Sequence, residues 1–123
     1  MLTSSTIDYM PKILKSFRKY IEKYECTYMV AKSDLFPGEI CYSLIFYHKG
    51  SGMPYLMVSQ HDKSKYATIY VNKYADNWSR SDCVYRDDCN ISNNIMEFIK
   101  AISECLITGE SEIYRSVKAD DLP

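Results

Sequence analysis

The chain lacks the features that usually identify membrane, secreted and disulfide-stabilised proteins. It has no uninterrupted apolar run of the roughly 18 residues that a membrane-spanning helix requires. Its N-terminus, MLTSSTIDYMPKIL, has neither the cationic start nor the apolar core of a secretory signal. The five cysteines are odd in number, and no two are spaced C-x-x-C, which excludes a fully paired disulfide framework. We therefore expect a cytoplasmic protein with no membrane contact.

Sequence motifs for cofactors, metals and catalysis are also missing. Glycine is scarce, with four in the chain, and none belongs to a phosphate-binding loop or a G-x-S-x-G nucleophile turn. A calcium loop starting at Asp76 fails because no glycine occurs before Cys89. Zinc would need Cys83 and Cys89 with a distant histidine, a weak pattern. We expect no cofactor and no metal, and a protein that is not an enzyme.

Hydrophobic periodicity predicts an α+β fold. Apolar residues recur at steps of three and four from Ile7 to Tyr24, which predicts an N-terminal helix that begins near Tyr9 or Met10. Residues 26–32, 39–48, 55–61 and 66–74 are rich in β-branched and aromatic residues and are separated by turn residues. They predict an antiparallel β-meander of three to four strands.

A second helix is predicted after the meander. Helical spacing links Ile95 to Leu106, with Asn94 or Ser92 as a cap and Gly109 as a left-handed C-cap. Residues 112–117 predict a short C-terminal strand. We expect a single domain over residues 1–123, with both helices on one face of the sheet and residues 119–123 as a frayed tail.

What the chain has in abundance is tyrosine, and one crowded segment combines aromatic rings with charge. Residues 73–89 read KYADNWSRSDCVYRDDC, which includes the only tryptophan, and we expect them to connect the last meander strand to the second helix. Aromatic residues are enriched at the centres of protein interfaces, and carboxylates attract basic partners. The predicted protein interface consists of Tyr74, Asp76, Trp78, Asp82, Tyr85, Asp87 and Asp88.

The charges are divided unequally along the chain. Residues 1–75 contain ten Lys/Arg and six Asp/Glu, whereas residues 76–123 contain five Lys/Arg and ten Asp/Glu. In size, compartment and acidic aromatic segment, the chain is similar to toxin-neutralising immunity and antitoxin proteins of bacteria and phages. That class-level resemblance implies a protein-binding inhibitor whose partner is a basic toxin domain, for instance a nuclease. No family motif accompanies it.

Two alternative functions have their own candidate residues. A nucleic-acid-binding protein would use the basic face of the N-terminal helix and strand tyrosines as stacking surfaces. These residues are Lys12, Lys15, Arg18, Lys19 and Lys23, and Tyr42, Tyr47, Tyr55, Tyr66, Tyr70 and Tyr74. A small hydrolase or nuclease would instead use His61, Cys89 and the aspartates of residues 73–89.

Overall fold

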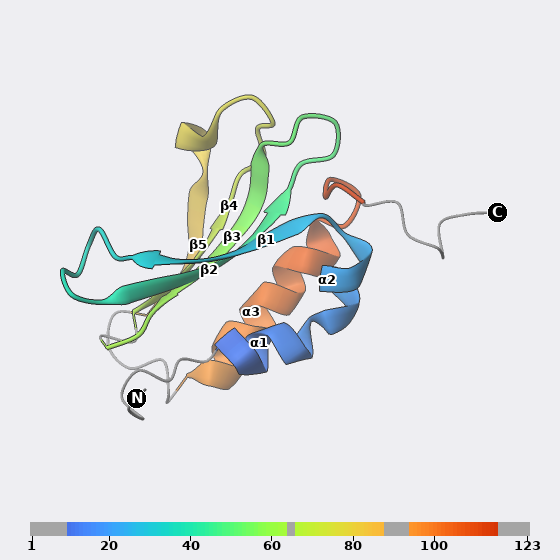
Figure 1. Ribbon diagram of the computed structural model, residues 1–123. Helices are drawn as coiled ribbons and strands as arrows, with labels where there is room; N and C mark the ends of the chain where they lie inside the picture. Colours follow the sequence, from blue (N-terminus) through green and yellow to red (C-terminus); the bar gives the residue numbers. More distant parts are fainter. Residues whose placement is uncertain (1–9, 64–65, 88–93, 116–123) are drawn as a thin grey trace.

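An antiparallel sheet of five strands in sequential order, β1-β2-β3-β4-β5, forms the centre of the fold (Figure 1). The computed structural model describes residues 10–63, 66–87 and 94–115. The strands are β1 (Cys26–Lys32), β2 (Ile40–Tyr47), β3 (Pro54–His61), β4 (Ala67–Val71) and β5 (Asp82–Asp87). The α+β meander is confirmed, but it has one strand more than the sequence predicted. The additional strand is β5, which lies inside the segment expected to be a connection.

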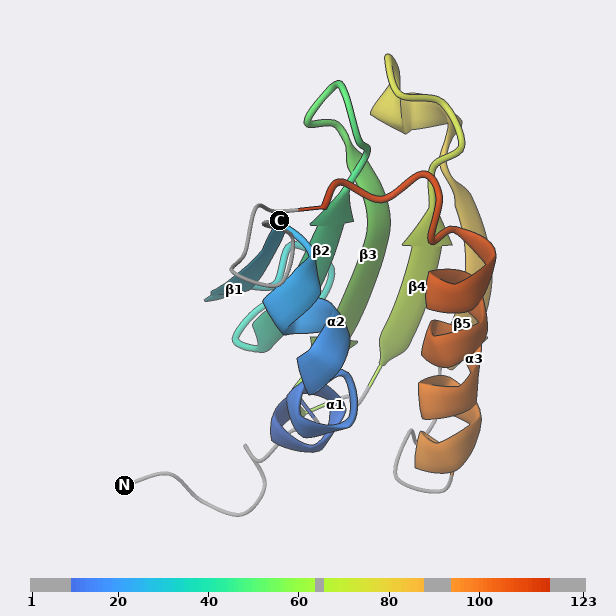
Figure 2. The same cartoon turned by 90° about the vertical axis from the view of Figure 1, so that its right-hand side faces the viewer.

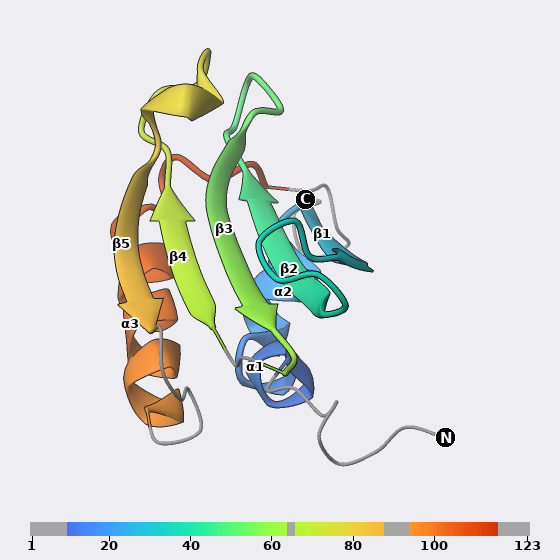
Figure 3. The same ribbon diagram turned by 90° about the vertical axis from the view of Figure 1, so that its left-hand side faces the viewer.

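The helices α1 (Met10–Ser16), α2 (Arg18–Lys23) and α3 (Ile95–Thr108) lie on one face of the sheet. Figure 2 shows them in front of the strands, and Figure 3 shows them behind. The predicted N-terminal helix is divided at Phe17, whose φ of −113° and ψ of 24° depart from helical values. The Ile21 amide nevertheless donates to the Phe17 carbonyl over 3.0 Å, so α2 continues directly from α1.

The core lies between the sheet and the helices. Alternate residues of the strands point to this side, which we call the helix face, because side chains alternate along a strand. Ile13, Phe98, Ile102 and Leu106 from the helices are fully buried against them. Burying one such side chain contributes roughly 1.5–3 kcal/mol. The strand residues of this core are Leu44, Phe46, Tyr55, Leu56, Val58, Ala67, Ile69 and Val71.

The opposite side of the sheet, the open face, is not covered by any α-helix of the described residues (Figure 3). Small polar side chains lie along its middle, where the Ser43 and Ser59 hydroxyls are 3.0 Å apart across β2 and β3. Tyr70 and Cys83 are paired across β4 and β5. The two faces therefore differ in chemistry, and the apolar core residues of the strands lie mainly on the helix face.

A C-terminal strand was predicted at residues 112–117. Residues 112–115, the described part of it, form two isolated β-bridges instead of a strand. Ile113 pairs with His48, and Arg115 pairs with Tyr24. The Tyr114 amide donates to the Tyr47 carbonyl over 2.6 Å, and the Glu25 amide donates to the Tyr114 carbonyl over 3.2 Å. The segment is thus inserted where β1 and β2 diverge and touches each strand only briefly.

The tail predicted at residues 119–123 lies outside the described residues. Within the described helices, none is both long and apolar enough to cross a membrane. Four of the cysteines are free thiols, namely Cys26, Cys41, Cys83 and Cys105.

Candidate functional site

The connection between β4 and β5, residues 72–81, has a defined shape. At its start, the buried side chain of Asn72 donates from Nδ2 to the Pro54 carbonyl over 3.3 Å and accepts from the Tyr74 amide over 3.0 Å. At its end, the Asn77 side chain accepts from the Ser79 amide over 3.0 Å and caps the short 3₁₀ helix η2 (Trp78–Arg80). Asn and Asp commonly stabilise such turns through their own side chains. The β4–β5 connection therefore holds its aromatic residues in fixed positions.

Trp78 lies against the open face rather than in the core. Its ring centroid is 6.4 Å from that of Tyr70, which is half-buried on the open face. The indole is itself only half-buried, so part of it is accessible. An aromatic ring that is anchored by one neighbour and open on its other side loses little conformational entropy on binding.

Tyr74 is held by a cation–π contact. The Arg80 guanidinium carbon is 3.5 Å from the centroid of the Tyr74 ring, within the range of this interaction. The tyrosine remains 41% exposed. The pair gives the β4–β5 connection a second ordered aromatic group beside Trp78.

Only part of the predicted acidic cluster is exposed. Asp76 and Asp82 lie on the surface. Asp87 is only 7% exposed, and its Oδ2 accepts from the Asn94 side chain over 2.7 Å. Because Asp87 pairs with Ala67 on the helix face, it links β5 to the start of α3, and the expectation that it belongs to an exposed interface is wrong. Asp88 lies outside the described residues.

Tyr85 also faces inward. Its ring lies 5.2 Å from the ring of Phe98, a fully buried residue of α3. Burial raises the pKa of the Tyr85 hydroxyl, and the nearby carboxylates of Asp87 and Glu97 raise it further. We therefore interpret Tyr85 as a residue that joins β5 to the core, in place of the predicted interface anchor.

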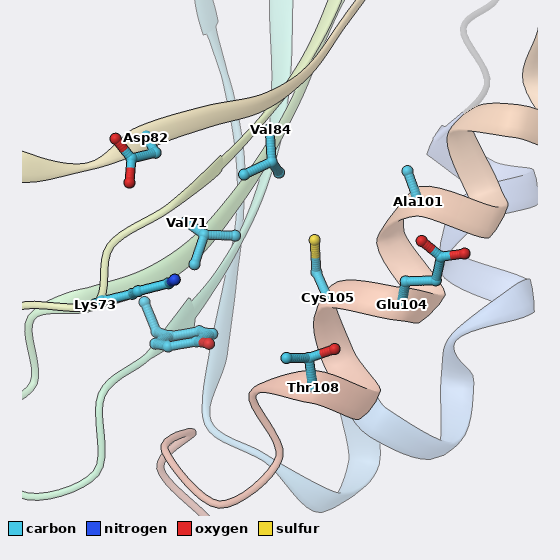
Figure 4. A pocket seen from close by; sticks show the side chains of 9 residues that line it. Val71, Lys73, Asp82, Val84, Ala101, Glu104, Cys105 and Thr108 are labelled. Carbon is cyan, nitrogen blue, oxygen red and sulfur yellow. The ribbon is translucent and has the colours of Figure 1, made fainter.

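A groove of about 310 Å³ opens beside Asp82, between β4, β5 and α3 (Figure 4). Its apolar lining consists of Tyr55, Val71, Val84, Ala101 and Cys105. Val84 is placed there by a bulge, since Tyr85 pairs with Ile69 and Cys83 pairs with Tyr70, which leaves Val84 without an opposite residue. Burial raises the pKa of the Cys105 thiol, which favours the neutral form.

Three charged side chains line the same groove. They are Lys73, Asp82 and Glu104, so the groove is acidic by one charge. No ion pair within 4.0 Å joins Asp82 or Glu104 to a cation among the residues that the structure places. Glu104 was not predicted as a site residue because α3 is separate from β5 in the sequence, and the helical pattern does not show which face of α3 borders the strand.

The hydrolase alternative is not supported by the positions of its residues. His61 ends β3 at the end of the sheet where β4 begins, whereas Asp82 pairs with Val71 at the opposite end. Asp87 lies nearer to His61 along the sheet but on the helix face, while His61 is on the open face beside Cys41. Cys89 is outside the described residues. The parts of the chain that are described contain no cluster of three His, Cys, Asp or Glu side chains suited to a metal ion.

His61 is instead part of an aromatic cluster. Its ring contacts Phe36 at 5.2 Å and Tyr66 at 5.4 Å between centroids. Burial lowers the pKa of the imidazole, although Glu39 and Asp62 act in the opposite direction. The Nδ1 atom is buried and has no hydrogen-bond partner in the described structure. These contacts favour a neutral ring that packs between aromatic neighbours.

The nucleic-acid alternative requires lysines and stacking tyrosines on one side of the molecule. Lys12, Lys15 and Lys19 are exposed on the helices. The tyrosines do not form a platform beside them: Tyr55 and Tyr66 are buried, and the hydroxyl of Tyr47 donates to Thr27 over 2.6 Å. Tyr70 lies on the open face, away from the helices. The basic residues are therefore separated from Tyr70.

Comparison of the chain with models of known protein families, with curated proteins and with solved structures finds no match.

Proposed function

We propose that this chain is a non-enzymatic protein-binding module whose main contact surface is the β4–β5 connection, with the groove beside Asp82, on the side of β5 that borders α3, as a second contact. The observation that supports it most is the fixed, partly exposed presentation of Tyr74 and Trp78 next to two exposed carboxylates. Large rings that are already ordered, with arginine nearby, are the groups that most often contribute strongly to protein binding.

The charges suggest the kind of partner. Asp82 and Glu104 line an apolar groove and outnumber Lys73. A lysine or arginine side chain of a partner would place its aliphatic part on Val71 and Val84 and its cation near Asp82 on one side of the groove or near Glu104 on the other (Figure 4). A basic protein domain therefore fits this surface. An inhibitor of a basic toxin, of the immunity or antitoxin kind, is the function that we infer.

A matched pair of tyrosines tests the contact surface. Tyr74 and Tyr114 are both 41% exposed, but only Tyr74 belongs to the β4–β5 connection. For a partner captured by the tagged full chain from its native cells, calorimetry should show that Tyr74→Ala weakens binding by about 1–2 kcal/mol. Tyr114→Ala should bind like the wild type.

Two outcomes would contradict the proposal. If both tyrosine variants bind as tightly as the wild type, the β4–β5 connection is not the contact surface. If the captured material is RNA or DNA, and its salt-sensitive binding is lost in a Lys12→Gln/Lys15→Gln/Lys19→Gln variant, the nucleic-acid alternative replaces this one.

A further inference from the structure

A second pocket, of about 270 Å³, lies on the open face at the end of the sheet where β4 begins, and we call it the open-face pocket. Strands β1, β2 and β3 and the loop between β1 and β2 contribute to its lining. Three of the lining side chains carry sulfur or imidazole nitrogen, namely Met29, Cys41 and His61. They come from three different strands, so no spacing in the sequence indicates that they meet.

The register of the sheet brings the thiol and the imidazole together. Cys41 is directly opposite His61 across β2 and β3. The Asp62 amide donates to the Ile40 carbonyl over 3.0 Å, so the neighbouring pair, Cys41 and His61, is not joined by backbone hydrogen bonds. The Cα atoms of such a pair are only about 4.5 Å apart, and their side chains are the closest in an antiparallel sheet.

Met29 is placed beside this pair. It lies opposite Ser43 across β1 and β2, and the Cys41 sulfur is 3.6 Å from the Ser43 hydroxyl. The thiol therefore lies toward the strand position that Met29 faces, within reach of a long and flexible thioether. Because Met29 is 46% exposed, its side chain can change rotamer without disturbing the core.

The His61 ring has an unused nitrogen. The residue is only 6% exposed, and its Nδ1 has no hydrogen-bond partner in the part of the chain that the structure describes. Buried polar atoms normally have a partner, and a bound ion is one explanation for an atom that lacks one. Burial also lowers the pKa of this imidazole, which favours the neutral form that metal binding requires.

We propose that the open-face pocket binds one monovalent copper ion, Cu(I), through the sulfur atoms of Cys41 and Met29 and a ring nitrogen of His61. Thiolate and thioether sulfur select Cu(I), and imidazole also suits copper. Binding releases the thiol proton of Cys41 to solvent, and the thiolate then balances the single charge of the ion. Lys32 and Asp34, which also line the pocket, have opposite charges, so a divalent ion would leave one positive charge uncompensated.

The proposed copper site is separate from the proposed protein contact. His61 ends β3 where β4 begins, whereas the β4–β5 connection leaves the sheet after Val71, at the other end. The site also differs from the metal clusters of His, Cys, Asp and Glu, because one of its three ligands is a thioether. A failure of either proposal would therefore leave the other standing.

The test is the affinity of the full chain for Cu(I), measured without oxygen by competition with a coloured Cu(I) chelator. Cys41→Ser should remove the tight site. Met29→Leu and His61→Phe should each weaken it by about tenfold or more, since loss of even an outer-shell partner typically costs roughly 10–100-fold in metal affinity. Since Met29 is half exposed, Met29→Leu should keep the fold even if a substitution at the buried His61 does not.

Matched controls separate this site from binding by thiols or thioethers in general. Cys83 and Met57 lie on the open face but do not line the pocket. Cys83→Ser and Met57→Leu should therefore bind one Cu(I) as tightly as the wild type. X-ray absorption at the copper edge should show sulfur and nitrogen ligands in the wild type, and the nitrogen should be lost in His61→Phe.

Three results would overturn the proposal. The wild-type chain could fail to take Cu(I) from the chelator. Cys41→Ser could bind the ion as tightly as the wild type. The control Cys83→Ser could lose as much affinity as Cys41→Ser, which would show that binding is a general property of the thiols of this chain.

Discussion

Gly109, at the end of α3, is a glycine for a reason that the sequence does not reveal. It ends α3, but its φ is −96°, so the predicted left-handed C-cap is wrong. A Cβ atom built at this position would instead meet the Cε2, Cζ and hydroxyl atoms of Tyr55. Glycine is therefore required here because the Tyr55 ring passes close to the backbone, and the φ angle does not require it.

Gly109→Ala should lower the free energy of unfolding by about 1–3 kcal/mol, because the added methyl group overpacks the contact with Tyr55. Urea denaturation measures the change. In a Tyr55→Leu background, where the clashing ring atoms are absent, the same substitution should cost less. An equal cost in both backgrounds, or a more stable Gly109→Ala variant, would show that the close approach is not the reason.

His61 gives a pH prediction. Its pKa is lowered in the folded protein, mainly by burial, so the unfolded chain binds the proton more readily. The resulting contribution to stability is complete above about pH 6.5, the ordinary pKa of histidine, and is lost as the pH falls below it. Unfolding in urea at a series of pH values should therefore show stability declining on the acid side.

His61→Phe keeps a ring against Phe36 and Tyr66 but cannot take up a proton. This variant should lose less stability than the wild type between neutral and mildly acidic pH. His48 is present in both proteins, so its effect cancels. The same acid dependence in both proteins would assign the effect to other groups.

Among the secondary-structure elements, the sequence predicted the helices and strands with a clear hydrophobic periodicity and missed β5, whose hydrophobic pattern is irregular. The spacing of Phe98, Ile102 and Leu106 predicted α3, and these residues are its buried face. β5 was missed because its residues are exposed at four of six positions and its bulge breaks the alternation at Val84. A bulge adds one residue to one strand, so a strict period of two fails at that point.

The residues of the predicted interface differ in exposure. Tyr74, Asp76 and Asp82 are exposed and Trp78 is half-buried against the open face, whereas Tyr85 and Asp87 turn toward α3. Spacing within a strand assigns Tyr85 and Asp87 to one side, but which side is buried depends on the helix that packs there. Glu104 could not be assigned from sequence for the same reason, since its place depends on how α3 docks beside β5.

Across the whole molecule, α1 and α2 differ from α3 in charge, and the described α-helices cover one face of the sheet but not the other. Lys12, Lys15 and Lys19 are exposed on α1 and α2, while Glu97 and Glu104 are exposed on α3. The acidic groove therefore borders the acidic helix. Under the proposed function, this arrangement would direct a basic partner toward the end of the sheet where β4 leads into β5.

Trp78 is the residue on which the proposed contact with a protein partner depends most. The most direct measurement is the dissociation constant of Trp78→Ala for the captured partner, with its free energy of unfolding measured in parallel. Binding should weaken by about 2 kcal/mol or more, while stability changes by about 1 kcal/mol or less, because the indole is only half-buried against Tyr70. A variant that binds normally, or one whose only defect is a large loss of stability, would contradict the account.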